Sequence, residues 1–186
     1  MTLLRSSLVL VAATFLLAAS PALAQQQRVS PPGVAGGVVD DNRVTVYYSR
    51  PFTKDPKTGE ARKIWGGLVP YGKVWRLGAN EATLLVTQKP IEMGGITIPA
   101  GAHSLFMLPN EDGTAKLIVN KQIGQSGTQY DEKQDLGRID LKKESAEKPA
   151  DQFTINVGKN TGEGGGGMLR LVWEETQYSV PFTVKK

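Results

Sequence analysis

Short segments in which apolar and polar residues alternate run along most of the chain. Residues 43–49 are one such segment, with Val44, Val46 and Tyr48 on one face. Successive side chains of a β-strand point to opposite faces of the sheet, so this two-residue period predicts a half-buried strand. The same period, or a short apolar run, predicts further strands at residues 83–88, 91–93, 96–98, 102–108, 115–120, 137–142, 152–157, 168–174 and 178–184.

Glycine and proline residues separate the predicted strands. Gly94 and Gly95 lie between two of them and tolerate the positive φ of a two-residue hairpin turn. Pro181 cannot donate to a ladder, so the last strand should be an edge or carry a bulge. Residues 142–150 have room for one helical turn at most. About nine short strands with little or no helix predict an all-β fold, an antiparallel β-sandwich or a jelly-roll-like barrel.

The first residues have the pattern of a secretory signal peptide. Met1–Ala24 contains one positive charge, Arg5, then an apolar run over Leu8–Ala19 and a closing Ala-x-Ala motif that ends at Ala24. The apolar run is shorter than the roughly 20 residues that span a bilayer. We therefore expect cleavage after Ala24, no transmembrane segment, and a mature protein in the periplasm or outside the cell.

The mature chain reads as one domain behind a short polar segment. Residues 25–37 are rich in Gln, Pro and Gly, which predicts a flexible N-terminal segment or a loosely held first edge, with order beginning near Val38. Residues 38–186 form the single predicted domain. The chain has no cysteine, so its stability must come from packing alone.

Composition argues against several function classes. The net charge is +4, but basic residues are interleaved with acidic ones, whereas a nucleic-acid interface needs them clustered on one face. With one histidine, His103, and no cysteine, the chain cannot assemble a His/Cys metal site. Residues 162–167 match G-x-G-x-x-G, yet the match is not followed by a helix, so it predicts no cofactor.

The most distinctive stretch is residues 62–83, which has neither a helical nor a strand period. It contains Trp65, Trp75 and Tyr71 together with four glycines, a composition typical of an ordered loop that packs on its own aromatic residues. One interpretation makes this loop a structural scaffold, with function elsewhere. The aromatic side chains would then cap the core, and Arg50 and Arg76 would pair with Glu81 or bind loop carbonyls.

This stretch and its neighbours resemble a known family. The relevant runs are Tyr-Ser-Arg-Pro at 48–51, Gly-Leu-Val-Pro-Tyr-Gly-Lys-Val-Trp-Arg at 67–76, Gly-Ala-Asn-Glu-Ala-Thr at 78–83, and Pro-Ala-Gly at 99–101 with Ser-Leu-Phe at 104–106. Through them, residues 38–184 resemble a bacterial family catalogued as domain of unknown function 2911. The resemblance implies an exported, mostly β protein and implies no activity. The family has a shorter segment where this chain has Lys57–Arg62, and often has Tyr in place of His103.

A second interpretation makes the loop a binding surface, because Trp, Tyr and Arg dominate recognition sites. Such a surface suits a small polar or carbohydrate-like ligand, or a carboxylate held by arginine. An envelope protein is the alternative partner. On this interpretation the protein is a non-catalytic binding or envelope-associated protein without cofactor or metal. The candidate ligand-binding residues are Arg50, Trp65, Tyr71, Trp75, Arg76, Asn80 and Glu81.

A third interpretation is enzymatic. Glu81 would act as acid or base, Arg76 would stabilise an anion, and His103 would assist. His103 shares a strand face with Leu105 and Met107, which instead favours a histidine packed in the core.

Overall fold

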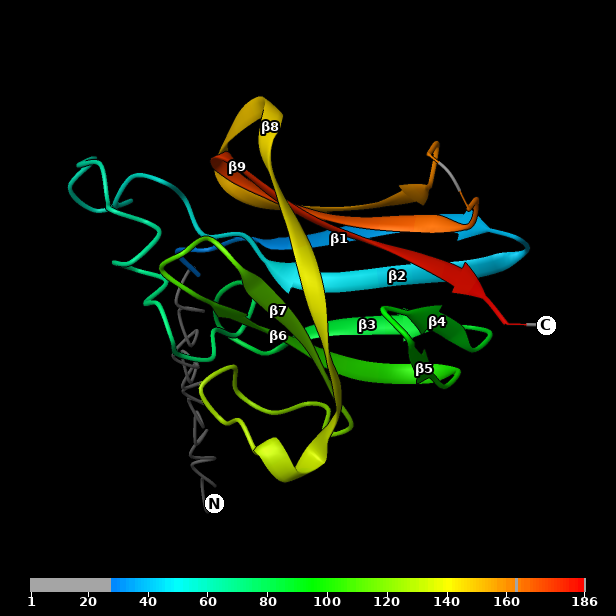
Figure 1. Ribbon diagram of the computed structural model, residues 1–186. Helices are drawn as coiled ribbons and strands as arrows, with labels where there is room; N and C mark the ends of the chain where they lie inside the picture. Colours follow the sequence, from blue (N-terminus) through cyan, green and yellow to red (C-terminus); the bar gives the residue numbers. More distant parts are fainter. Residues whose placement is uncertain (1–27, 163, 186) are drawn as a thin grey trace, which may run out of the picture.

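A computed structural model describes residues 28–162 and 164–185, so the predicted signal peptide lies outside the described residues. The described part forms nine strands and one short 3₁₀ turn (Figure 1). The elements in chain order are β1 (Pro32–Val39), β2 (Asn42–Ser49), β3 (Thr83–Thr87), β4 (Ile91–Met93), β5 (Ile96–Ile98), β6 (Gly101–Pro109), β7 (Ala115–Asn120), η1 (Glu132–Gln134), β8 (Asp135–Lys159) and β9 (Gly167–Val184).

All nine strands belong to one antiparallel sheet, in the order β1-β2-β3-β6-β7-β8-β9-β4-β5. This confirms the predicted all-β, antiparallel class. In Figure 1 the sheet folds over itself, with parts of β8 and β9 lying above β1 and β2 while β3 to β7 lie below. A sheet folded in this way is compatible with the two packed layers of the predicted sandwich.

The first strand begins earlier than predicted. Pro32 already pairs with Ser49 of β2, so ordered strand begins there and not near Val38. The glycines of this segment allow close packing that a longer side chain would prevent. A Cβ atom on Gly37 would lie 3.1 Å from the carbonyl oxygen of Val157 in β8. Of the two alternatives for this segment, a flexible tether or a first edge, the described part from Pro32 onward is an edge strand, and at Gly37 it lies directly against β8.

The two strands predicted within residues 135–159 are one continuous strand, β8. Its first part pairs with β7, up to the pair of Leu141 with Ala115, and from Lys142 onward it pairs with β9. The polar middle that the sequence assigned to at most one helical turn is therefore strand. Register shifts occur between Ser145 and Ala150, so pairing to β9 continues through a bulged region that has no apolar period.

The last two predicted strands are likewise one strand, β9. Pro181 lies between Ser179, which pairs with Lys142 of β8, and Phe182, which pairs with Met93 of β4. Neither the edge nor the bulge expected at Pro181 is present, because β9 lies inside the sheet order. The residue without an N–H stands where the strand changes partner, and no ladder hydrogen bond is needed there.

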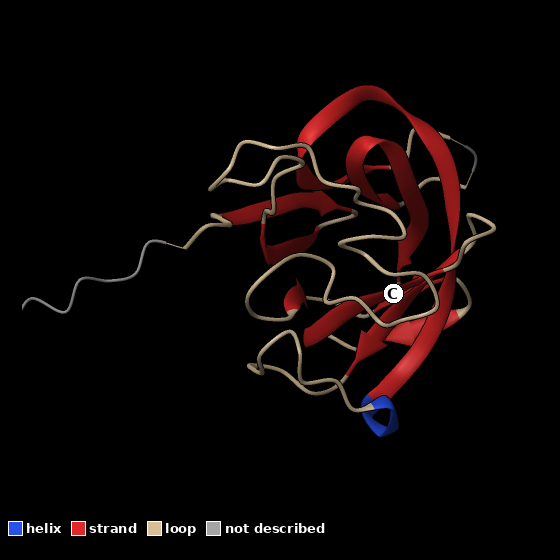
Figure 2. Ribbon diagram, turned by 90° about the vertical axis from the view of Figure 1, so that its left-hand side faces the viewer, coloured by secondary structure: helices blue, strands red, loops and turns tan. Residues whose placement is uncertain are grey.

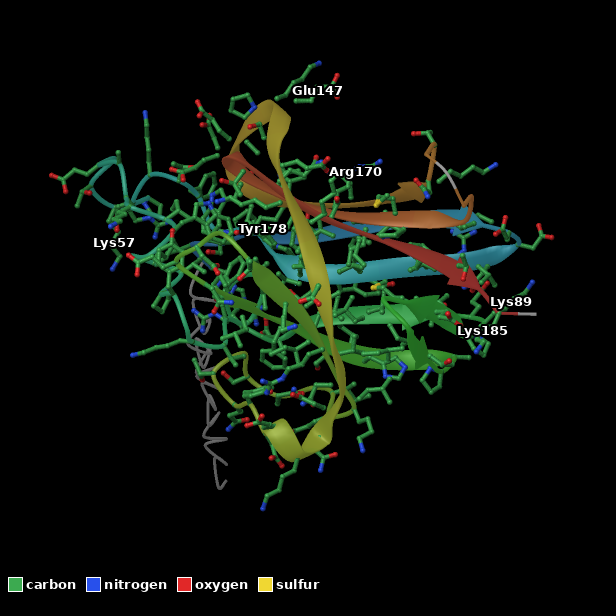
Figure 3. All side chains as sticks on the ribbon, in the orientation of Figure 1. Lys57, Lys89, Glu147, Arg170, Tyr178 and Lys185 are labelled. Carbon is green, nitrogen blue, oxygen red and sulfur yellow. The ribbon has the colours of Figure 1, made fainter. Side chains whose placement is uncertain are left out.

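An aromatic cluster joins the β2–β3 connection to the long strands. Trp75 stacks on the fully buried Trp173 of β9, with ring centroids 5.8 Å apart, and meets Phe153 of β8 at 5.0 Å. Trp65 packs edge-on against Tyr178 at 5.5 Å (Figure 3 labels Tyr178). Such contacts stabilise beyond simple area burial. They fix the middle and the later part of the connection on the core, as the scaffold interpretation predicts.

Candidate functional site

The β2–β3 connection, residues 50–82, lies at one end of the sheet, on the left of Figure 1. Figure 2 looks onto this end, where several loops gather. Backbone hydrogen bonds attach the connection to β6: Trp75 N donates to Met107 O at 2.7 Å, and Met107 N donates to Trp75 O at 2.8 Å. The residue that follows, Arg76, is therefore held on a rigid base.

A cavity of about 430 Å³ opens beside this attachment. We call it the arginine cavity. Its walls come from Ser30 before β1, from the β2–β3 connection, and from residues 127–130 in the loop between β7 and η1. The charged residues in its lining are Arg62 and Arg76, and no Asp or Glu is among the lining residues that the structure describes. Its electrostatic field is therefore positive, which favours an anion.

Arg76 is the least engaged of these charges. Its guanidinium has no hydrogen-bond or ion-pair partner within the described part of the chain, although the residue is half-buried. It also lines a shallower neighbouring depression with Arg28, Asn80, Glu81 and Ser126. A guanidinium offers five N–H donors, so Arg76 leaves all five available to a ligand.

Arg62 is held by the chain but not satisfied by it. One Nη donates to the carbonyl oxygen of Phe52, and its backbone N–H donates to Thr53 O at 3.1 Å. Its Nε is buried and has no partner among the described residues. Arg62 thus contributes a positive charge to the cavity wall, while its unpaired Nε lies buried behind that wall.

Two backbone amides in the lining are also unused. Gly78 and Ala79 are buried, and their N–H groups donate to no acceptor in the part of the chain that the structure describes. Leu77 and Asn80 on either side have left-handed backbones, with φ of 51° and 60°. Buried amides are nearly always paired in folded proteins, so two unpaired ones in residues that line a cavity are an exception.

Tyr130, in the loop between β7 and η1, also lines the cavity. Its hydroxyl donates to Asp135 Oδ2 at 2.6 Å and accepts from Arg138 Nη2 at 3.0 Å, while Asn120 Nδ2 donates to Asp135 Oδ1 at 2.9 Å. Burial and the hydrogen bond to Asp135 raise the pKa of Tyr130 to about 12. The phenol stays protonated at physiological pH, and the side chain serves as a fixed wall.

Arg50, a predicted ligand-binding residue, is used by the fold. Its Nε donates to Phe153 O at 3.3 Å and its Nη2 donates to Thr154 Oγ1 at 2.9 Å, both on β8. The hydroxyl of Tyr48 accepts from the N–H of Ile155 on the same strand, at 3.0 Å. Side chains of β2 and its end thus satisfy backbone groups of β8, and Arg50 does not line the arginine cavity.

The predicted aromatic residues divide between core and cavity. Trp75 lines the arginine cavity, but Trp65 and Tyr71 do not. Trp65 belongs to the aromatic cluster. Tyr71 packs over Gly66, where a Cβ would lie 2.6 Å from the Tyr71 ring. These two residues shape the loop rather than the cavity.

Asn80 and Glu81 lie beside the cavity, in the shallower depression. Asn80 Nδ2 donates to Ser30 O at 3.2 Å and to Ser49 Oγ at 3.1 Å, which ties the N-terminal segment to the loop. Glu81 pairs with Arg28 at 2.6 Å, so the expected pairing with Arg50 or Arg76 is wrong. The hydrogen bond from Arg28 lowers the pKa of Glu81. The ion pair leaves Arg76 uncompensated.

His103 is buried on β6, as expected of a core histidine. Its Nε2 lies 2.9 Å from Pro99 O, and its Nδ1 is buried without a partner among the described residues. Neither His103 nor Glu81 lines the arginine cavity. The geometry therefore does not assemble the enzymatic constellation there.

Sequence reasoning missed most of the cavity. The distinctive stretch of residues 62–83 includes Arg62, Gly78 and Ala79, but nothing in their spacing marks them as residues that line a cavity. Gly127 and Tyr130 come from a loop far along the chain, and no sequence signal connects them to Arg76.

Within the described ranges, no group of three or more His, Cys, Asp or Glu side chains could hold a metal ion. No described helix has the length and apolar character needed to cross a membrane.

Comparison with known proteins identifies the family of the chain. The model of a family described as protein of unknown function, DUF2911, matches residues 30–182. The chain belongs to this family, which confirms the resemblance seen in its sequence. No curated protein and no solved structure matches the chain.

Proposed function

We propose that this protein is an exported, non-catalytic binding protein that holds a small organic anion in the arginine cavity. Export is supported by the signal-peptide pattern of residues 1–24, and on this proposal the mature protein works in the periplasm or outside the cell. The observation that carries the binding proposal is Arg76. It is a half-buried guanidinium without a partner in the described chain, in a cavity without a lining carboxylate.

Several features of the lining agree with an anionic ligand. Arginine suits carboxylate and phosphate groups because its planar donors match their oxygen atoms. Arg62 adds a second positive charge, and Gly78 and Ala79 add unpaired amides. The lining therefore favours an anion over the neutral sugar that the sequence also allowed.

The apolar part of the lining suits the organic body of the ligand. Pro51, Leu68, Val74 and Trp75 line the same cavity. Ligand sites in proteins are typically about 300–1,000 Å³, lined mostly by apolar side chains with a few polar anchors. The arginine cavity falls in this range at about 430 Å³.

Binding without catalysis is supported by the state of the titratable groups. Glu81 is engaged by Arg28, and His103 is buried against Pro99. Tyr130, which does line the cavity, has a pKa of about 12 and does not exchange a proton near neutral pH. A general acid or base works best with a pKa near the operating pH.

Titration of the mature chain with small aromatic anions tests the proposal. Trp75 lines the cavity, so intrinsic fluorescence reports on occupancy. We expect saturable binding of at least one anion, weakened about tenfold or more in Arg76→Gln. Arg170→Gln is the matched control, because Arg170 projects from β9, lies outside the cavity and has no ion pair among the described residues (Figure 3). Equal binding by wild type and Arg76→Gln would contradict the proposal.

Export has its own test. When the full chain is produced in a bacterium, we expect a periplasmic or secreted protein whose N-terminal residue is Gln25, read by mass spectrometry. Replacing Ala22 and Ala24 together by Gln should block cleavage. A cytoplasmic product that retains Met1 would contradict export and leave the binding test unaffected.

A further inference from the structure

Building on the proposed binding function, we infer that the anion held in the arginine cavity is a phosphate monoester in its doubly charged form. Three properties of the cavity favour this ligand: its positive charge, its unused hydrogen-bond donors and its apolar side.

Within the described ranges, the lining of the cavity contains no negative charge to balance its two arginines, Arg62 and Arg76. Asp55, a carboxylate outside the lining, attracts Arg62 electrostatically but forms no ion pair with it in the described chain. The nearby cations are already neutralised, since Arg28 pairs with Glu81 at 2.6 Å and Arg138 pairs with Asp135 at 3.1 Å. A carboxylate or a sulfate monoester would balance one of the two guanidinium groups. A phosphate monoester carries about −1.5 to −2 at pH 7 and balances both.

The unused donors exceed what a carboxylate can accept. Arg76 offers its whole guanidinium, and the lining residues Gly78 and Ala79 have backbone N–H groups, all without acceptors in the described chain. A carboxylate presents two oxygen atoms, whereas a phosphate monoester presents three strongly accepting terminal oxygens. Mixed recognition by arginine and backbone amides is the usual chemistry of phosphate sites.

The apolar side of the cavity requires an organic group on the phosphate. Leu68 is 44% exposed, one of the most exposed large apolar side chains of the described chain, and it lines the cavity with Val74 and Pro51. Inorganic phosphate would leave this surface in contact with water. A monoester places its anionic end on the arginines and its organic body on the apolar wall.

Calorimetry on the mature chain with four probes tests the inference: phenyl phosphate, phenyl sulfate, benzoate and inorganic phosphate. We expect phenyl phosphate to bind about tenfold or more tightly than each of the others. Its affinity should fall as the pH decreases through the second pKa of phosphate, about 6, because the second charge is lost. Phenyl sulfate has the same shape and does not titrate there, so its affinity should stay constant and serve as the matched control probe.

Variants assign the effect to the two arginines. Arg76→Gln and Arg62→Gln should each weaken phenyl phosphate about tenfold or more and reduce its advantage over phenyl sulfate, while Arg170→Gln should do neither. Because Arg62 also binds Phe52 O, thermal melting checks that its variant folds. If the Arg62→Gln variant is unfolded, the affinity of Arg76→Gln for phenyl phosphate and the pH profile of the wild type test the inference instead.

The outcomes separate the inference from the function on which it rests. If benzoate or phenyl sulfate binds more tightly than phenyl phosphate, and this binding still depends on Arg76, the ligand is not a phosphate monoester. The proposed anion-binding function would still stand. If inorganic phosphate binds as tightly as phenyl phosphate, the inference that the ligand carries an organic group on the apolar wall is wrong. Absence of binding by all four probes would overturn the phosphate inference, and failure of the wider anion series would overturn the proposed function as well.

Discussion

The side chain of Arg76 lies on Gly127 so closely that a Cβ atom there would stand 2.4 Å from Arg76 Cδ and 2.7 Å from Arg76 Cβ. Gly127 N–H donates to Asn80 O at 3.0 Å, which holds the two loops together at this point. The loop between β7 and η1 therefore supports the stem of the arginine whose charged end is unpaired. The position of the key charge depends on a glycine from a remote part of the chain.

Gly127→Ala should therefore change the position of Arg76 in the cavity without removing or adding a charged group. The added methyl group must displace the Arg76 stem or the backbone at Asn80, since it would also lie 2.8 Å from Asn80 O. We expect a loss of about 1–3 kcal/mol in unfolding free energy, the usual cost of overpacking, and weaker anion binding. Chemical denaturation and calorimetry measure the two effects.

The control for this glycine is Gly158 on β8. A Cβ there meets nothing within 4 Å, and its backbone is not left-handed. Gly158→Ala should preserve both stability and binding. If Gly127→Ala binds anions as tightly as Gly158→Ala, the loop does not position Arg76.

Replacement of Arg50 should lower the stability of the protein much more than replacement of Arg76. Arg50→Ala removes hydrogen bonds to Phe153 O and Thr154 Oγ1, so we expect a loss of about 1–3 kcal/mol. For a domain of this size that corresponds to a melting temperature lower by several degrees, about 2–4 °C per kcal/mol. Arg76→Ala removes no contact of this kind and should change stability by about 0.5 kcal/mol or less. Comparable destabilisation by both variants would show that Arg76 has a structural role.

The ion pair of Arg28 with Glu81 should contribute little stability. Both side chains are more than half exposed, and exposed pairs are worth about 0–1 kcal/mol. Because the pKa of Glu81 is lowered in the folded protein, the contribution is present above the unfolded pKa and is lost as the pH falls through the lower folded value. Denaturant unfolding of wild type and Glu81→Gln should thus differ slightly at neutral pH and converge in acid. A large difference at neutral pH that survives acid would refute this view.

Tyr130 should titrate far above the ordinary range. Its pKa is about 12, raised by burial and by the hydrogen bond to Asp135. A raised pKa means that the stabilisation is complete below the unfolded value near 10 and is lost as the pH rises towards 12. Ultraviolet titration of wild type and Tyr130→Phe should show the variant losing a transition near pH 12. Tyr178, with a pKa also about 12, is the matched control, and Tyr178→Phe should leave the Tyr130 transition in place. Loss of a transition near pH 10 in Tyr130→Phe would contradict the buried hydrogen bond.

Local sequence patterns predicted the local structure well. The Gly94-Gly95 hairpin forms as expected, with φ of 54° and 78°, because those positive angles suit glycine far better than other residues. On β2, Val44, Val46 and Tyr48 face the core as their spacing predicts. Both features depend on residues a few positions apart, and the necessary information is therefore local.

The pattern was less informative where pairing is remote. The polar middle of β8 is strand because β9 pairs with it, as in Ser145 with Thr176, and not because of any apolar period. Likewise β1 is a strand from Pro32 because β2 lies beside it and Gly37 allows close approach to β8. Backbone pairing of this kind overrides weak local preference, as is usual for sheets.

The site shows the same division. The sequence alone predicted the all-β class, the anchoring of the loop by aromatic residues and, as an expectation, the export signal. It also suggested Trp75 and Arg76 as candidate ligand-binding residues, because composition and residue type suffice for these predictions. Only the tertiary structure could pair Glu81 with Arg28, assign Arg50 to β8, and bring Gly127 and Tyr130 beside Arg76. A partner across the fold is set by long-range packing, and packing decides which arginine is satisfied and which remains available to a ligand.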